Sequence, residues 1–154
     1  MEDLQRIIAR LGLQPLPREG GWFRRYHVSA ETDPAGRPLR SSIHFLMAPG
    51  EFSALHRLQS PETWEFRSGA PVELLLLPPA GPARTVQLGD AGAGEAAVTV
   101  PGGTWQGARS LGAWSLVDCT MAPAWVEREF ELGDRAELIR RFPAEAGLIA
   151  ALTR

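Results

Sequence analysis

The sequence has 154 residues, of which 44% are hydrophobic and 22% are charged, and such a chain can bury a core of its own. A formal net charge of −2 offers no basic surface, so we expect no nucleic-acid partner. No apolar run reaches the 18 or more residues of a membrane span, Cys119 is the only cysteine, and the N-terminus lacks a secretion signal. We therefore expect one cytoplasmic domain over residues 1–154 that does not associate with membranes.

The chain begins with a helical pattern and continues with strands. Apolar residues recur at helical spacing from Leu4 to Leu11, and Gly12 follows where a helix would stop, which predicts a helix over about residues 3–11. Short apolar or alternating runs follow, separated by Gly and Pro clusters that are typical of hairpin loops. The predicted strands cover residues 22–29, 41–47, 53–58, 63–67, 72–77, 85–88, 97–100, 104–109 and 114–121, with 126–130 as a further candidate.

The end of the chain is helical again. Residues 134–142 lie between Gly133 and Pro143 and predict a helix, and residues 144–152 suit another short one. Many short strands with helices only at the two ends predict an all-β fold, either a sandwich or a double-sheet jelly-roll barrel. We place the barrel core at about residues 20–130.

One polar pair interrupts the strand-rich region. His56 and Glu62 lie between Gly50 and Gly69, a spacing that suits two antiparallel strands joined by a short turn. Such a hairpin delivers both side chains to one concave face. An imidazole and a carboxylate in an apolar segment suit a metal site, an acid–base pair or a polar ligand clamp.

The spacing of this pair resembles a known signature. The pattern Gly50–x5–His56–x–Leu58–x3–Glu62–x6–Gly69 resembles the first motif of the cupin superfamily, in which a second histidine normally stands where Leu58 is. Residues 101–106 (Pro-Gly-Gly-Thr-Trp-Gln) resemble the second motif, Pro-x-Gly-x-x-His, with glutamine in place of the histidine.

The flanking segments resemble cupin family 5, single-domain cupins long catalogued as a domain of unknown function. They include Glu-Gly-Gly-Trp-Phe-Arg at 19–24 and Phe-Glu-Leu at 130–132, and the resemblance covers residues 4–143. It implies a homodimeric double-stranded β-helix with one pocket per subunit, similar to sugar-nucleotide 3,5-epimerases, and carries no firmly established reaction. Two residues depart from the family pattern: His44 stands where tyrosine is typical, and Glu65 where histidine is common.

A metal site is the first interpretation of the pocket. Catalytic cupins typically hold Fe, Mn, Ni or Zn with three histidines and a glutamate. Here the ligands would be His56, Glu62 and Gln106, and a carboxamide contributes little to transition-metal affinity. His44 would replace the missing imidazole only if it points inward, which strand alternation leaves open. We therefore expect no cofactor, with a divalent metal as an alternative.

Acid–base catalysis without a metal is the second interpretation. An epimerase or isomerase acting on a sugar or sugar nucleotide needs a base on one face of its substrate and an acid on the other. His56 would be the base, and Tyr26 or His44 the opposing acid. Arg24 would neutralise a developing enolate or bind a phosphate.

A binding protein without turnover is the third interpretation. Trp64 and Trp105 would provide flat apolar walls beside the polar residues, a combination that suits a carbohydrate or nucleotide-like ligand. The expected ligand-binding residues are Arg24, Ser53, His56, Glu62, Trp64 and Gln106. The sequence leaves all three interpretations open.

Overall fold

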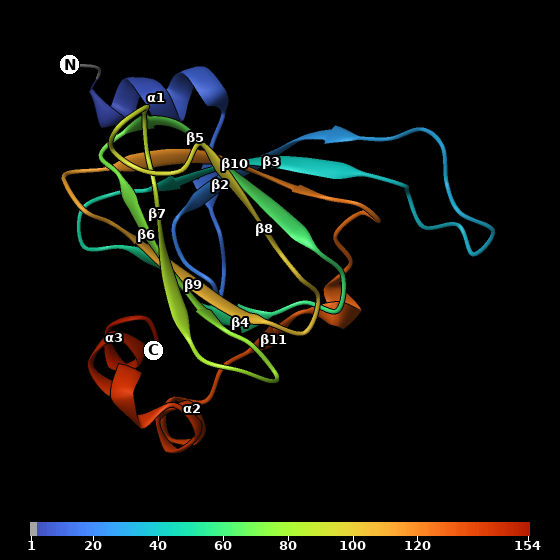
Figure 1. Ribbon diagram of the computed structural model, residues 1–154. Helices are drawn as coiled ribbons and strands as arrows, with labels where there is room; N and C mark the ends of the chain where they lie inside the picture. The colour runs from blue at the N-terminus through green and yellow to red at the C-terminus, as the bar shows by residue number, and fades with distance from the viewer. Residues whose placement is uncertain (1–2) are drawn as a thin grey trace.

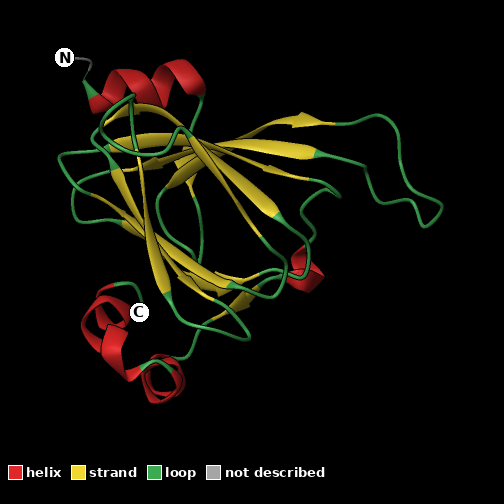
Figure 2. Cartoon of the chain, in the orientation of Figure 1, coloured by secondary structure: helices red, strands yellow, loops and turns green. Residues whose placement is uncertain are grey.

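The structure, a computed structural model that describes residues 3–154, consists of two antiparallel sheets that lie face to face (Figures 1 and 2). The six-stranded sheet has the order β1-β2-β3-β10-β5-β8, and the five-stranded sheet has the order β11-β4-β9-β6-β7. Strands distant in sequence are therefore neighbours, as in a jelly roll, which confirms the predicted all-β barrel. The strands are β1 Gln14–Pro15, β2 Trp22–Val28, β3 Ser41–Met47, β4 Phe52–Arg57, β5 Glu62–Gly69, β6 Val72–Leu77, β7 Arg84–Leu88, β8 Ala97–Val100, β9 Trp105–Ser110, β10 Ser115–Met121 and β11 Glu131–Leu132.

Helices cover the outer faces of both sheets (Figure 1). Helix α1 (Leu4–Leu11) starts at the Asp3 side chain, which accepts from the Gln5 amide, and ends at Gly12 with φ 64°. Its Ile7 packs on outward residues of the six-stranded sheet. Helices α2 (Arg135–Arg141) and α3 (Ala146–Ala151), joined by the 3-10 turn η2 (Pro143–Glu145), pack on the five-stranded sheet. These are the predicted N-terminal and C-terminal helices.

The candidate strand at 126–130 is wrong. Glu127–Glu129 form the 3-10 turn η1, and only Glu131–Leu132 pair with β4. The physical reason is the side chain of Glu129, which is buried and accepts hydrogen bonds from Arg37 and Ser60. A turn brings this carboxylate to those two donors. The backbone amides of Glu129 and Phe130 donate within the turn, so the segment needs no neighbouring strand. Strand β1 was not predicted, because a two-residue strand has no periodicity to detect.

Strand β3 shows which side chains point into the barrel. Ile43, Phe45 and Met47 point into the barrel and pack in or against its core, whereas Leu46 packs outward beneath α1. His44 alternates with these residues and therefore points outward. This settles the orientation that strand alternation alone left open.

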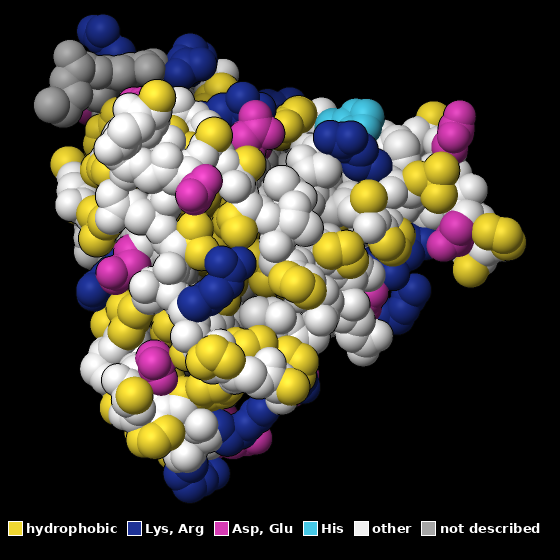
Figure 3. Space-filling view, in the orientation of Figure 1, with side chains coloured by type: hydrophobic (Ala, Val, Ile, Leu, Met, Phe, Trp, Pro, Cys, Tyr) yellow, Lys and Arg dark blue, Asp and Glu magenta, His cyan; other side chains and the backbone are white. Residues whose placement is uncertain are grey.

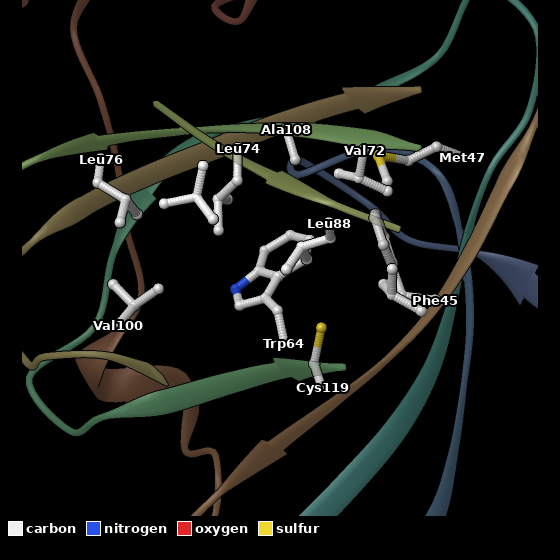
Figure 4. Packing of buried hydrophobic residues seen from close by; sticks show 12 residues of the cluster. Phe45, Met47, Trp64, Val72, Leu74, Leu76, Leu88, Val100, Ala108 and Cys119 are labelled. Atoms are coloured by element: carbon white, nitrogen blue, oxygen red, sulfur yellow. The ribbon is translucent and has the colours of Figure 1, made fainter. Parts of the chain in front are cut away.

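The barrel interior is solid at one end and hollow at the other. Trp64 lies in the middle of a cluster that includes Phe45, Leu74 and Leu88, and Cys119 lies against it (Figure 4). Trp64 and Cys119 belong both to this cluster and to the wall of a cavity, so they form the floor of the hollow end. Truncation of such a buried tryptophan to alanine typically costs about 3–5 kcal/mol.

The surface carries charges of both signs. Arginine and acidic side chains are interspersed on the face shown in Figure 3. Over residues 3–154, no helix has both the length and the apolar character needed to cross a bilayer.

Candidate functional site

The hollow end of the barrel is a cavity of about 400 Å³ between the two sheets. This volume lies at the lower end of the range of ligand pockets, about 300–1,000 Å³. Apolar and aromatic side chains dominate its wall, among them Phe23, Ile43, Leu58, Trp64 and Phe130. Its buried polar side chains include His56, Glu62 and Ser41, and Glu19 beside His56 is largely buried. The Ser41 hydroxyl already accepts from the Trp125 amide, so His56, Glu62 and Glu19 define the chemistry of the site.

His56 reaches the cavity from β4 and has a fixed ring orientation. Its Nδ1 donates to the carbonyl oxygen of Ala54 at 2.7 Å, so the neutral ring presents a lone pair at Nε2. The ring stacks on Phe130, with centroids 5.5 Å apart and planes inclined by 19°. An imidazole held in one tautomer inside a largely apolar cavity is a competent proton acceptor.

A β-bulge in β4 explains why two of its polar residues share one face. Ser53 pairs with Ala108 and His56 pairs with Gln106, so three steps on β4 oppose two steps on β9. Strict alternation would send residues 53 and 56 to opposite faces. The extra residue turns both inward, which is a frequent use of bulges next to functional sites.

Glu19 is a site residue that the sequence analysis did not single out. It lies in the loop before β2, its Oε2 accepts from the Ser53 hydroxyl at 2.8 Å, and its Oε1 is 3.6 Å from Nε2 of His56. That last separation is longer than a hydrogen bond, so a ligand proton or hydroxyl can bridge the two atoms. Its position directly before Gly20 was the available signal, since a glycine with φ 97° lets the loop approach closely.

Arg154, at the C-terminus, holds the same loop in place. The Arg154 guanidinium donates to the carbonyl oxygens of Arg18, Glu19 and Phe52 at 3.1–3.3 Å and lies over the Phe52 ring. A side chain at Gly20 would collide with this guanidinium. The Glu19 loop therefore has a fixed position relative to His56.

Glu62 is a buried acid on β5. Burial raises its pKa to about 8, the charge of Glu19 adds to the rise, and a hydrogen bond from the Gln106 side chain opposes it. Because the pKa exceeds 7, the Glu62 carboxyl group is protonated in most molecules at neutral pH and can donate a proton. Burial also raises the pKa of Cys119, with Glu62 and Glu19 as further causes, so this thiol stays protonated.

Gln106 and Trp64 are joined behind Glu62. The indole Nε1 of Trp64 donates to Oε1 of Gln106 at 2.6 Å, which leaves the amide nitrogen of Gln106 to donate to Glu62. Both residues are buried, and Trp64 lines the cavity. The structure therefore brings together His56, Glu62, Gln106, Trp64 and, through Glu19, Ser53.

Tyr26 and His44 do not face His56, and the expectation that either stands across the cavity is wrong. Both lie on the outer face of the six-stranded sheet, where their rings stack at 4.0 Å. Nδ1 of His44 lies 2.7 Å from Oδ1 of Asp118, and the Tyr26 hydroxyl donates to Oδ2 at 3.1 Å. Arg67 also donates to Oδ2, at 2.8 Å. Strand alternation sends these side chains away from the barrel interior.

Arg24 also lies outside the cavity. Its guanidinium occupies the space beside Gly12, where a side chain would meet it, so it points toward the end of α1. The next residue, Arg25, lines the cavity instead. Trp105 lies outside the cavity too, against the C-terminal helices, with the Arg57 guanidinium 4.5 Å from its ring centroid.

The donor set does not fit a tightly held metal ion. Of the three expected ligands, Glu62 is largely protonated at neutral pH, and the carbonyl oxygen of Gln106 already accepts from Trp64. His44 is outside the barrel. In the described part of the chain, no three His, Cys, Asp or Glu residues are grouped so as to hold a metal ion.

Two solved structures are similar to this chain over almost its whole length. The X-ray crystal structure of a Shewanella oneidensis protein is 32% identical with a TM-score of 0.91, and it covers 100% of this chain and 99% of that chain. A hypothetical protein from Leishmania major is 28% identical with a TM-score of 0.87, covering 99% of each chain. No curated protein matches the sequence.

More distant cupins share the fold alone. Bacillus subtilis oxalate decarboxylase is 14% identical with a TM-score of 0.59, and the match covers 91% of this chain but 37% of that chain. The family model Cupin_5, described as Cupin superfamily (DUF985), matches residues 5–133. With this match over most of its length and a relative above 30% identity, the chain belongs to the DUF985 family of the cupin superfamily.

Proposed function

We propose that the cavity binds a small hydroxycarbonyl compound such as a sugar, and that His56 and Glu62 isomerise it by proton transfer. One observation carries the proposal: a proton acceptor and a neutral acid line the same apolar cavity. A carboxyl group kept neutral by burial, beside an imidazole with a free lone pair, is a combination that enzymes use for proton transfer. A hydroxylated ligand also suits Glu19, whose carboxylate accepts hydrogen bonds from hydroxyl groups.

The chemical step uses the two groups in turn. Nε2 of His56 takes the proton from the carbon next to the carbonyl, and the electron pair of that C–H bond forms a carbon–carbon double bond. The carbonyl oxygen accepts the proton of Glu62, which gives a neutral enediol. Protonated His56 then gives its proton to the former carbonyl carbon, while the Glu62 carboxylate takes the proton of the hydroxyl on the adjacent carbon, where the new carbonyl forms. A well-placed proton transfer of this kind contributes about 10²–10⁴ in rate.

An isomerase is favoured over an epimerase. Inversion at one carbon needs a second acid–base group on the opposite face of the substrate, and the two residues expected in that role, Tyr26 and His44, lie outside the barrel. Transfer between neighbouring carbons on one face needs only one base. His56, Glu62 and Glu19 support that simpler reaction.

Deuterium exchange tests the proposal. Sugars are incubated with the protein in D₂O, and ¹H NMR follows the loss of the proton next to the carbonyl. We expect exchange with the native chain, a loss of about 10²–10⁴ in His56→Asn, and full exchange in the control His27→Asn, because His27 is exposed outside the cavity. Binding without exchange would favour the non-catalytic ligand-binding protein, and unchanged exchange in His56→Asn would exclude His56 as the base.

A further inference from the structure

The charges around the cavity are divided between its two ends. The inner end carries the buried Glu62 and the largely buried Glu19 beside His56. The mouth carries two arginines, Arg18 and Arg25, both exposed on its rim, and one acid, Glu127, which pairs with Arg18 and leaves a net positive charge there. A ligand that spans the cavity therefore meets acids at one end and guanidinium groups at the other.

Arg18 is held at the mouth by an unusual backbone. Its φ is 67°, and it is the only non-glycine residue between 3 and 154 with a positive φ. Such conformations are strained and cluster at functional sites. The strain places the Arg18 guanidinium 4.5 Å from the centroid of Phe130, the ring that stacks on His56. The mouth and the inner end are thus in contact through one aromatic ring.

Both guanidinium groups have donors that a ligand can use. Nη2 of Arg18 lies 3.3 Å from Glu127, in an ion pair whose side chains are 48% and 78% exposed, so it exchanges readily with another anion. Nη2 of Arg25 makes a long bond of 3.4 Å to the carbonyl oxygen of Trp125. The planar fork of arginine matches the oxygens of a phosphate or carboxylate.

We propose that the substrate carries an oxyanion, a phosphate monoester or a carboxylate, at the end remote from its reacting carbon, and that Arg18 and Arg25 bind this group at the mouth. This rests on the proposed function for the role of the inner end. Like-charge repulsion from Glu19 keeps the oxyanion away from His56. The division of charge therefore fixes the direction in which the substrate enters, with its carbonyl end toward Glu62.

A first experiment tests the mouth without a sugar. Thermal melting is followed against inorganic phosphate at constant ionic strength, so that general screening cancels. We expect phosphate to raise the melting temperature of the native chain and of Arg84→Gln/Arg140→Gln, a control that removes the same charge from exposed arginines away from the cavity. The double variant Arg18→Gln/Arg25→Gln should lose the rise. An equal rise in that variant, or none in the native chain, would overturn the proposal.

A second experiment uses a matched set of ligands. Calorimetry compares glucose, glucose 6-phosphate and glucuronate, which differ only at the sixth carbon. We expect one of the two anions to bind about tenfold more tightly than glucose, and this preference to vanish in Arg18→Gln/Arg25→Gln. The anion that wins identifies phosphate or carboxylate as the natural group. Glu127→Gln should tighten anion binding, since it removes the competing carboxylate; a weaker affinity would contradict the assignment.

The outcomes separate the two proposals. If glucose binds through His56 and neither anion binds more tightly, the mouth inference fails and the proposed function stands. If phosphate raises the melting temperature through Arg18 and Arg25 but no sugar binds, the anion site stands and the sugar part of the proposed function fails.

Discussion

The six-stranded sheet separates two histidine–acid clusters that differ in how their charges are compensated. On the outer face, Asp118 receives hydrogen bonds from Tyr26 and Arg67 and contacts His44. On the inner side, Glu62 has only a neutral amide as partner, with another acid nearby, and its pKa rises to about 8. A carboxylate with well-matched partners stabilises a fold, whereas an uncompensated acid in a cavity can move a proton. The comparison assigns structure to the outer cluster and chemistry to the inner one.

The largest expected effect comes from replacing each of the two histidines in turn and comparing the two variants. We expect His56→Asn to reduce proton exchange by about 10²–10⁴. His44→Asn should instead lower the free energy of unfolding by about 1.5–3 kcal/mol, because it weakens a bond to a buried charged group, and leave exchange intact. Deuterium exchange and urea unfolding of both variants measure this. Loss of exchange in both would remove the distinction between the clusters.

A second prediction concerns pH. Glu62 keeps its proton to about pH 8 in the folded chain but loses it near pH 4.5 when unfolded. The folded state therefore binds more protons between these values, so the free energy of unfolding falls as the pH rises, by up to about 1.4 kcal/mol per pH unit. Urea unfolding at pH 5.5, 6.5 and 7.5 measures this slope. Glu62→Gln should remove it, and Glu65→Gln, an exposed residue of the same strand, should keep it. A slope that persists in Glu62→Gln would show that another group titrates.

A third prediction removes the charge of the outer cluster. Asp118→Asn keeps the shape of the side chain but removes the negative charge that faces Arg67 and one of the two acceptor oxygens. We expect a loss of about 1.5–3 kcal/mol in the free energy of unfolding. Ligand affinity, measured by calorimetry on the folded fraction, should be unchanged. A change in affinity larger than the change in stability would connect the outer cluster to the cavity.

The smallest effect is expected from a single hydroxyl group. Tyr26→Phe removes the bond to Asp118 and keeps the stacking on His44. We expect a loss of about 0.5–1.5 kcal/mol in the free energy of unfolding and no change in exchange. Urea unfolding resolves a difference of this size when the native chain and the variant show the same dependence of the free energy of unfolding on urea concentration. A gain in stability would mean that the hydroxyl is better solvated than bonded.

Periodicity was sufficient to predict the strands of the barrel, but not which face of each strand points into it. The predicted strands lie within two residues of the observed ones, apart from 126–130, because alternation and turn residues are local signals. Whether Arg24 or Arg25 faces the cavity depends on which face of β2 is covered, which no local signal contains. The role of Glu19 has a similar origin: Gly20 signals a close approach of its loop, but the partners of a loop residue are fixed only when distant segments meet.

Several expectations stay predictions. The roles of His56, Glu62 and Gln106, the absence of a nucleic-acid partner and the cytoplasmic location are among them. The expected homodimer is another, and light scattering should give the mass of two chains. The exposed apolar side chains of Tyr26, Val28 and Leu39 are the surface that we expect such a dimer to bury. A mass of one chain would contradict the dimer and leave the cavity unaffected.

The bulge in β4 has a consequence for comparing relatives of this chain. Ser53 and His56 share a face only because β4 has one extra residue between them, compared with the segment of β9 that pairs with them. A deletion of one position at 54–55 would keep every functional side chain in the sequence and yet turn one of them out of the barrel. In an alignment, a gap at this place should therefore mark a change of activity more reliably than the loss of any single polar residue.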